Sequence, residues 1–438
     1  MPRVAVAVLA VCVAAPAAAG GLDAWLARPE PDAGWHVASR AAAAGGEVVR
    51  LRGVSQAWRG IRWRHDLEVV VPARRRHPDV ALLVVAATTG GRDAHRAIAD
   101  AAGVTVAVLG DVPNQPLLGG RWEDDLVAET FARYVRTGDA EWPLLFPMTK
   151  AAVRAMDALQ TFDPGLRRFV VTGASKRGWT AWLAGAVDGR VAGVVPVVFD
   201  NLRFEAQLPR QLAAWGRYSD RLVDYTGRGL PALLDTPRGR ALVAEVDPWF
   251  RRDRLAAPSK LLVHGTNDPY WTVDATRAYW DGLAGEKAVL YVPNGGHGVA
   301  AAPRVRDATI AFLGRVAAGR ALPVVAATVA RDGPARALRV TVCEPAAAVR
   351  VWTATAPSAD FRDARWTSTP ATPAGDAFHA PLPAARGRFV AWFAEAAFDA
   401  GALPVATPIE VRRPDAAPAP VAGRPSNAQN PPVREAER

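Results

Sequence analysis

The chain is poor in cysteine. Its 438 residues include two cysteines, Cys12 and Cys343, and Cys12 lies in an N-terminal segment that we expect to be removed. Cys343 would then have no partner, so no intrachain disulfide can form. No Cys/His spacing is of the zinc-binding type either. We therefore expect a fold that is stabilised by packing, without a metal or another cofactor.

Lysine is also scarce, although the formal net charge is +10. Only Lys150, Lys176, Lys260 and Lys287 are present, and the remaining positive charge comes from arginines scattered singly along the chain. The sequence has no basic helix and no basic strip interleaved with aromatic residues, which a nucleic-acid interface requires. It thus argues against a nucleic-acid partner and leaves a small-molecule or peptide substrate.

The N-terminus has the features of a secretory signal peptide. Arg3 supplies a positive charge, residues 4–13 form an apolar run, and three alanines precede Gly20. This pattern predicts cleavage after Ala19. Because the apolar run is too short to span a bilayer, we expect no integral membrane segment after cleavage and a periplasmic or secreted location in a bacterium.

A Gly-x-Ser turn at Ser175 connects a short apolar, β-branched run to a helix-like segment. Small residues at Gly173, Ala174 and Gly178 allow the sharp turn that a nucleophile elbow needs. Ser175 would project at a helix N-terminus, where the helix dipole favours developing negative charge. A strand-to-helix turn with a capping serine has similar local features, and Gly178 is one position later than in the usual G-x-S-x-G pattern.

Two later strand ends supply an acid and a base. Asp268 follows the apolar run at 260–264, and His297 follows the run at 288–292 within a Gly-rich loop. The order Ser, Asp, His, with each residue at the carboxyl end of a strand, is that of α/β-hydrolases. Asp200, which ends the strand after the elbow helix, is the alternative acid. We predict that Asp268 contacts His297, since Asp200 leads into an insertion where a helix cap is expected.

The chain divides into regions with different hydrophobic patterns. Strand-like runs alternate with helical segments over residues 20–321, which predicts an α/β-hydrolase fold with a mostly parallel sheet and helices on both faces. The alternation fails at about 200–258, where we expect a cap over the active site; a surface helical excursion is the alternative. Period-two strands over 322–412 predict a small C-terminal β-sandwich, and the Pro/Ala-rich segment 413–438 is expected to be disordered.

Several short motifs together resemble the PhoPQ-activated pathogenicity-related family of exported α/β-hydrolase-like proteins. They are Ser55-Gln56-x-Trp58, Val112-Pro113-Asn114-Gln115-Pro116, Glu123-Asp124-Asp125-Leu126, the elbow from Gly173 to Trp179, Gly265-Thr266-Asn267-Asp268-Pro269-Tyr270-Trp271, Gly295-Gly296-His297-Gly298 and Asp360-Phe361-Arg362-x-x-x-Trp366. The resemblance covers most of the chain and implies a serine-hydrolase scaffold, sometimes classed with peptidases. It does not name a substrate.

The predicted chemistry is acyl transfer to water, with Ser175 as nucleophile, His297 as base and Asp268 as its orienting acid. The backbone N–H of Lys176 and one from residues 88–91, at Thr89 or Gly90, would form the oxyanion hole. Candidate substrate-binding residues are Arg177, Trp179, Trp249 and Trp271.

Three functions stay open at this point. A peptide or peptide-like amide is the leading substrate, on the family resemblance. The Ser-Lys-Arg-Gly elbow also resembles the Ser-Arg-Asn-Gly elbow of glucuronoyl esterases, so a carbohydrate ester is the alternative. A non-catalytic binding or signalling protein on the same scaffold is the third. The acidic residues Glu123, Asp124 and Asp125 are expected to cap a helix, with a catalytic carboxylate pair as the alternative.

Overall fold

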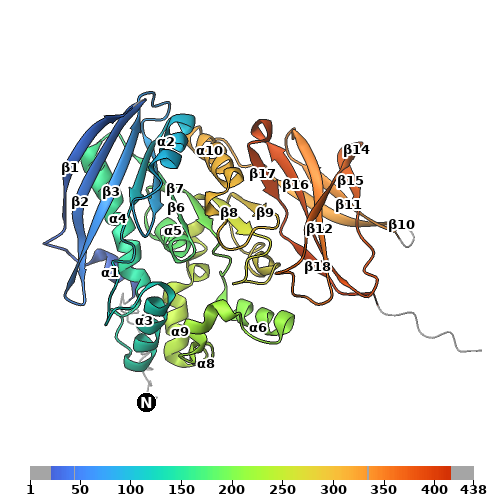
Figure 1. Cartoon of the computed structure of the whole chain (residues 1–438), viewed down its shortest axis with the longest axis horizontal. Coiled ribbons are helices and arrows are strands. Elements are labelled where there is room, and N and C mark those ends of the chain that lie inside the picture. Colours follow the sequence, from blue (N-terminus) through green and yellow to red (C-terminus); the bar gives the residue numbers. More distant parts are fainter. Residues whose placement is uncertain (1–20, 44, 333–334, 416–438) are drawn as a thin grey trace, which may run out of the picture.

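The fold is built around one long, twisted β-sheet (Figure 1). The computed structural model describes residues 21–43, 45–332 and 335–415, so the predicted signal peptide and nearly all of the predicted tail lie outside the described residues. The first part of the sheet has the order β1-β2-β3-β5-β4-β6-β7-β8-β9. Its strands are β1 (Gly34–Ala43), β2 (Gly46–Trp58), β3 (Ile61–Pro72), β4 (Val80–Val85), β5 (Thr105–Leu109), β6 (Arg168–Ala174), β7 (Val191–Val197), β8 (Ser259–Gly265) and β9 (Lys287–Val292).

Strand direction divides this part of the sheet into two. β1, β2 and β3 are antiparallel to their neighbours, whereas β5, β4, β6, β7, β8 and β9 run parallel to one another. The carboxyl ends of the parallel strands therefore lie along one edge, where open α/β sheets form their ligand crevices. The prediction of an α/β-hydrolase fold with a mostly parallel sheet is confirmed.

Successive side chains of the strands point to opposite faces of the sheet and pack into two separate hydrophobic cores. In β4, Ala81 and Leu83 pack on one face of the sheet, whereas Val80 and Leu82 pack on the other. Because both faces are covered, the parallel strands are mostly apolar. The helices outside the 200–258 segment are α1 (Leu22–Ala27), α2 (Arg92–Ala102), α3 (Glu123–Thr137), α4 (Leu145–Phe162), α5 (Lys176–Val187) and α10 (Pro303–Ala317). α4 packs beside α5 on one face, and α2 packs beside α10 on the other.

Residues 200–258 form a helical group beside α3 at the lower end of the view in Figure 1. The segment contains α6 (Phe204–Trp215), α7 (Val223–Thr226), α8 (Leu230–Leu233), α9 (Pro237–Val246) and short 3-10 turns at Asp220–Leu222, Pro248–Arg251 and Arg254–Ala256. Helices α7, α8 and α9 all contact α3. This segment leaves the sheet at the carboxyl end of β7, the same edge at which Ser175 follows β6.

The C-terminal region consists of two β-layers. Its strands are β10 (Val325–Asp332), β11 (Ala335–Val342), β12 (Ala348–Ala356), β13 (Thr367–Pro370), β14 (Thr372–Ala374), β15 (Ala377–Pro381), β16 (Phe389–Phe398), β17 (Leu403–Ala406) and β18 (Glu410–Arg412). One layer has the order β10-β11-β15-β14. The other continues the central sheet in the order β9-β17-β16-β12-β13, joined where Ala406 pairs with Val289. Sequence patterning predicted the β-layers and missed their continuity with the central sheet.

The Ser55-Gln56-x-Trp58 motif is a buried structural network at the end of β2. Ser55 Oγ lies 2.9 Å from Nε2 of His65, whose Nδ1 lies 3.0 Å from the Gly110 carbonyl. The Gln56 amide donates to Ser55 Oγ, and the Trp58 indole donates to a backbone carbonyl before α4. Burial opposes the charged imidazolium and lowers the pKa of His65 to about 4. His65 is thus a neutral structural histidine.

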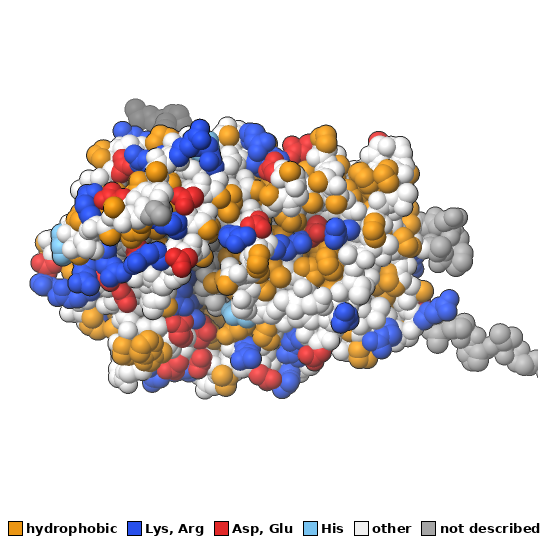
Figure 2. Space-filling model, turned by 45° about the horizontal axis from the view of Figure 1, so that its top comes forward, with side chains coloured by type: hydrophobic (Ala, Val, Ile, Leu, Met, Phe, Trp, Pro, Cys, Tyr) orange, Lys and Arg blue, Asp and Glu red, His pale blue; other side chains and the backbone are white. Residues whose placement is uncertain are grey.

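The surface bears no large patch of one charge on the face shown in Figure 2, where basic and acidic side chains are interspersed. None of the helices in the described part of the chain is long and apolar enough to cross a membrane.

Candidate active site

Ser175 occupies a strained turn between β6 and α5. Its φ of 56° and ψ of −125° are unusual for a residue with a side chain. The turn brings backbone atoms so close that a Cβ on Gly173 would lie 2.6 Å from the Arg177 carbonyl oxygen, and one on Gly178 would lie 3.0 Å from the Gly173 carbonyl oxygen. The Ser175 N–H donates to the Val197 carbonyl at 2.8 Å, which ties the turn to β7. The two glycines are required here, and the turn displays Ser175 at the start of α5.

His297 and Asp268 are directly bonded. His297 Nδ1 lies 2.8 Å from Asp268 Oδ2, while Asp268 Oδ1 accepts the backbone N–H of Tyr270 at 2.9 Å. The bond to a carboxylate assigns the proton to Nδ1 and leaves Nε2 as the acceptor nitrogen. Among the described residues, this buried Nε2 has no hydrogen-bond partner. Ser175 and His297 both line the same cavity.

Asp200, the alternative acid, is held elsewhere. Its carboxylate accepts the Tyr279 hydroxyl at 2.6 Å and the Thr276 hydroxyl at 2.8 Å, and its nearest histidine is His264, at 3.8 Å. The prediction that Asp268 contacts His297 is therefore confirmed. The helix cap expected at Asp200 is wrong, because its carboxylate instead ties the end of β7 to the segment between β8 and β9.

The loops that carry the acid and the histidine pack directly on each other. A Cβ on Gly265 would lie 2.4 Å from the carbonyl oxygens of Gly295 and Gly296, so only glycine fits at the end of β8. The Asn267 N–H donates to the Gly295 carbonyl at 2.8 Å, and the Asn294 N–H donates to Thr266 Oγ1 at 2.8 Å. These bonds fix the spacing of the loops and hence of the Asp268–His297 pair.

A C-terminal loop is hydrogen-bonded to both of these loops. The Asn267 side-chain amide donates to the carbonyls of Arg362 and Ala364 at 2.9 and 2.8 Å, and to that of Phe361 at 3.4 Å. Asn294 exchanges two bonds with the backbone of Trp366, at 2.8 and 3.1 Å. We call this set of bonds the asparagine clamp. Sequence reasoning missed it, although the motif from Asp360 to Trp366 was a signal that the segment mattered.

The cations beside the nucleophile are neutralised within the protein. Lys176 Nζ lies 2.7 Å from Glu123 and 3.4 Å from Asp124, and the Arg177 guanidinium binds Glu123 at 2.6 and 2.8 Å. Burial alone would raise the pKa of Glu123, but the bonds and charges of Arg177 and Lys176 outweigh it and lower the pKa to about 2. Glu123 thus joins the first turn of α3 to the elbow, a role beyond the helix capping predicted for it.

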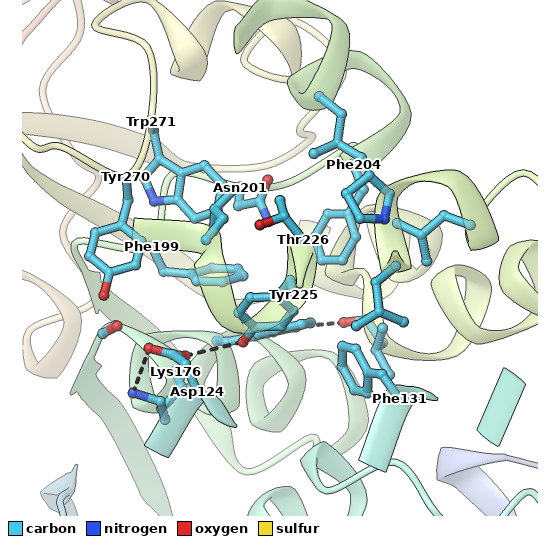
Figure 3. Close-up of a pocket in the computed structure, with 18 of the residues that line it drawn as sticks. Asp124, Phe131, Lys176, Phe199, Asn201, Phe204, Tyr225, Thr226, Tyr270 and Trp271 are labelled. Carbon is cyan, nitrogen blue, oxygen red and sulfur yellow. Dashed lines mark hydrogen bonds and ion pairs between the residues drawn. The ribbon is translucent and has the colours of Figure 1, made fainter. Parts of the chain in front are cut away.

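The cavity that opens on Ser175 extends beneath the helical group at 200–258 (Figure 3). Of the predicted substrate-binding residues, Trp179 and Trp271 line it. Arg177 lies outside the lining because Glu123 and the Val112 carbonyl hold its guanidinium. Trp249 also lies outside, since its ring packs over the Gly282 backbone and beneath the guanidinium of Arg252.

The residues predicted to form an oxyanion hole lie only partly at the cavity. Lys176 is the first residue of α5, so its backbone N–H directly follows Ser175 in the chain. Thr89 and Gly90 do not line the cavity, and Thr89 packs against the Gly110 backbone after β5. Tyr270, which sequence reasoning did not select, lines the cavity and stacks on His297 with ring centroids 4.1 Å apart. Burial and the nearby Asp124 charge raise the pKa of Tyr270 to about 12, so its hydroxyl stays a donor.

In the described part of the chain, no group of three or more His, Cys, Asp or Glu side chains has an arrangement that could hold a metal ion. The groups that line the cavity include a serine, a carboxylate-bound histidine and the hydroxyls of Tyr225 and Tyr270. A serine beside such a histidine can act as an acyl-group acceptor.

The sequence of the chain matches a known protein family. The model for the family described as "PhoPQ-activated pathogenicity-related protein" matches residues 22–364. A curated relative, autocrine proliferation repressor protein A of Dictyostelium discoideum, is 39% identical over 201 residues. That match covers 43% of this chain, and the chain spans only 40% of the relative's length.

Solved structures with a similar arrangement are distant in sequence. An acetyl xylan esterase from Paenibacillus sp. R4 is 15% identical, with a TM-score of 0.49 over 67% of this chain and 91% of that one. An acylaminoacyl peptidase of Pyrococcus horikoshii is 12% identical, with a TM-score of 0.42 over 64% of this chain and 49% of that one.

Proposed function

Since this chain belongs to the PhoPQ-activated pathogenicity-related protein family, we propose that it is an exported serine hydrolase that transfers acyl groups to water. One observation carries the proposal: Ser175 stands in a strained elbow on the same cavity as a histidine whose Nδ1 is bound to Asp268 at 2.8 Å. A strained backbone at a displayed serine has a cost in stability, and such strain clusters at functional sites.

The mechanism assigns one role to each residue. His297 Nε2 removes the proton of Ser175 Oγ as the oxygen attacks the substrate carbonyl, and Asp268 stabilises the imidazolium that forms. The tetrahedral oxyanion is held by the Lys176 N–H. His297 then protonates the leaving group, and a water molecule, activated by the same nitrogen, hydrolyses the acyl-enzyme.

The second oxyanion donor has two candidates. The N–H groups at Thr89 and Gly90 stay a prediction, since a substrate-dependent shift would be needed to bring them to the cavity. The Tyr270 hydroxyl already lines the cavity and is protonated at neutral pH. Its position favours Tyr270 as the second donor.

A peptide or peptide-like amide is the substrate class that we favour over a uronate ester. The elbow of this chain resembles that of glucuronoyl esterases in having a basic residue after the serine. Here, however, Lys176 and Arg177 are both paired with Glu123, which leaves neither cation free for a uronate carboxylate. The paired cations therefore weigh against the carbohydrate-ester alternative.

Labelling with a fluorophosphonate tests the proposal, because such probes react only with an activated serine. The wild-type protein should be labelled at Ser175, and Ser175→Ala should lose labelling while its thermal unfolding stays nearly unchanged. Loss of a triad nucleophile reduces turnover by about a millionfold. Ser259→Ala is the matched control, since the Ser259 hydroxyl bonds only to exposed Glu286. Labelling that persists in Ser175→Ala would refute the assignment, and an unlabelled wild type would favour the non-catalytic alternative.

A further inference from the structure

The cavity beneath the helical group at 200–258 has an almost entirely apolar wall. It runs from Ser175 and His297 between α3, α5 and the helices of the 200–258 group. Its apolar lining includes Phe131, Trp179, Phe199, Phe204, Leu242 and Val246. An apolar cavity that opens on Ser175 has the form of a ligand-binding pocket.

The aromatic part of the wall is rigid. Trp179 stacks on Phe199 with ring centroids 4.9 Å apart, and the rings of Phe131 and Phe204 meet Trp179 edge-on at 5.7 and 5.4 Å. The indole N–H of Trp179 donates to the Val246 carbonyl, so its single polar group is already used. The wall therefore presents carbon surface to a ligand in a preformed shape.

Three of the polar groups that line the cavity, Asp124, Tyr225 and Lys176, are paired with one another near the elbow, while Asn201 and Thr226 also line it. Asp124 accepts the Tyr225 hydroxyl at 3.1 Å and lies 3.4 Å from Lys176 Nζ, as drawn in Figure 3. Burial and the Asp124 charge raise the pKa of Tyr225 far above its usual range, which keeps its hydroxyl protonated as the donor. A ligand with several hydroxyl groups would lose its bonds to water here without replacing them along the apolar wall.

We propose that this cavity binds a bulky apolar acyl group, either a medium-length aliphatic chain or a large apolar side chain on the acyl side of the scissile bond. The inference rests on the proposed hydrolase function and adds the substrate class. The acyl group fills the apolar cavity, while the leaving group faces the open side near Tyr270 and His297. The attack on the carbonyl is the acyl transfer already described, with the leaving group protonated by His297.

Two matched substrate series test the inference. In the first, p-nitrophenyl esters and N-acyl p-nitroanilides vary the acyl group from acetyl to decanoyl; in the second, butyryl esters vary the leaving alcohol over the same range of size. We expect kcat/KM to rise along the first series by about fourfold per added methylene until the cavity is full. The second series should vary much less.

Substitutions at Val243 locate the effect in the cavity. Val243 on α9 lines it, so Val243→Phe should shift the preferred acyl length downward and Val243→Ala should shift it upward. Val223→Phe is the matched control, because Val223 on α7 is 63% exposed and does not line the cavity. Its ratio of octanoyl to acetyl kcat/KM should equal that of the wild type.

The outcomes separate this inference from the proposed function. Fluorophosphonate labelling of Ser175 combined with rates that are flat or falling along the acyl series would overturn the apolar acyl pocket alone. A strong dependence on the leaving alcohol, or a Val243→Phe preference unchanged from the wild type, would do the same. Absence of both labelling and hydrolysis would overturn the proposed function, and the acyl pocket with it.

Discussion

Asn267→Ala should slow turnover by up to about a hundredfold, although the Asn267 side chain contacts neither Ser175 nor His297. Its amide holds Asp268's loop to the C-terminal loop through bonds of 2.9 and 2.8 Å to the carbonyls of Arg362 and Ala364. A buried hydrogen bond contributes about 1 kcal/mol net, so losing both removes about 2 kcal/mol of support. A shift of about 1 Å in a catalytic group can cost on the order of a hundredfold in rate.

The assay separates positioning from substrate binding. Steady-state kinetics should show a fall in kcat with little change in KM, and the rate of fluorophosphonate labelling should fall in parallel. Asn267→Asp keeps the size of the side chain but directs a negative charge at carbonyl oxygens, so it should be at least as damaging as Asn267→Ala. A kcat within twofold of wild type for both variants would refute the role that we give to the asparagine clamp.

Thr407→Ala is the control for general loosening of the C-terminal region. Thr407 Oγ1 accepts the Ala394 N–H at 3.0 Å, a side-chain bond to backbone within the C-terminal layers. Its loss removes one such bond, so the melting temperature should fall by about half as much as in Asn267→Ala, while kcat stays near the wild-type value. If Thr407→Ala slows turnover as much as Asn267→Ala does, the effect of Asn267 is a general loss of stability.

Three further predictions follow from the site and its surroundings. Asp268→Asn should reduce kcat by about ten-thousandfold through the wrong imidazole tautomer of His297, whereas Asp200→Asn should mainly lower the melting temperature; equal losses of kcat would contradict the assignment of the acid. Tyr270→Phe should reduce kcat by about a hundredfold if its hydroxyl holds the oxyanion, and unchanged single-turnover rates would return that role to Thr89 or Gly90. Burial lowers the pKa of His65 from 6.5 to about 4, so the contribution of neutral His65 to the free energy of unfolding is fully present above pH 6.5. That contribution, about 3 kcal/mol, is lost as the pH falls from 6.5 to 4. Urea titrations should show this loss in the wild type and not in His65→Gln.

The parts of the site that sequence reasoning found are those with local signals. The elbow was recognisable because its sharp turn requires glycine at positions 173 and 178, close to Ser175 in the sequence. In the structure, a Cβ at either position would meet backbone atoms of the turn itself or of β7. Asp268 and His297 were recognisable because each follows a short apolar run, and parallel strands bring their carboxyl ends to one edge. Chain order alone did not choose between the two acids, since Asp200 and Asp268 both lie between Ser175 and His297. Asp268 was preferred because Asp200 leads into the insertion, where a helix cap was expected.

What was missed depends on contacts between distant segments. The amide of Asn267 meets carbonyls more than 90 residues later in the chain, and Glu123 neutralises cations more than 50 residues away. No periodicity or spacing encodes such pairings, so Arg177 seemed available for a substrate. The join between β9 and β17 was hidden for the same reason, because period-two patterning predicts strands but does not name their neighbours.

The asparagine clamp also has a consequence for synthesis of the chain on the ribosome. All three residues of the proposed Ser175–Asp268–His297 triad have been translated by position 297, yet the carbonyls that hold Asn267 lie at positions 361–364, and β17 at Leu403–Ala406 supplies the neighbour of β9. Folding begins from the N-terminal part during synthesis. The nascent chain therefore contains Ser175 for a long interval before the asparagine clamp and the pairing of β17 with β9 can form. We expect hydrolytic activity to begin only when about the last quarter of the polypeptide has emerged, so the growing chain stays inactive until the clamp closes.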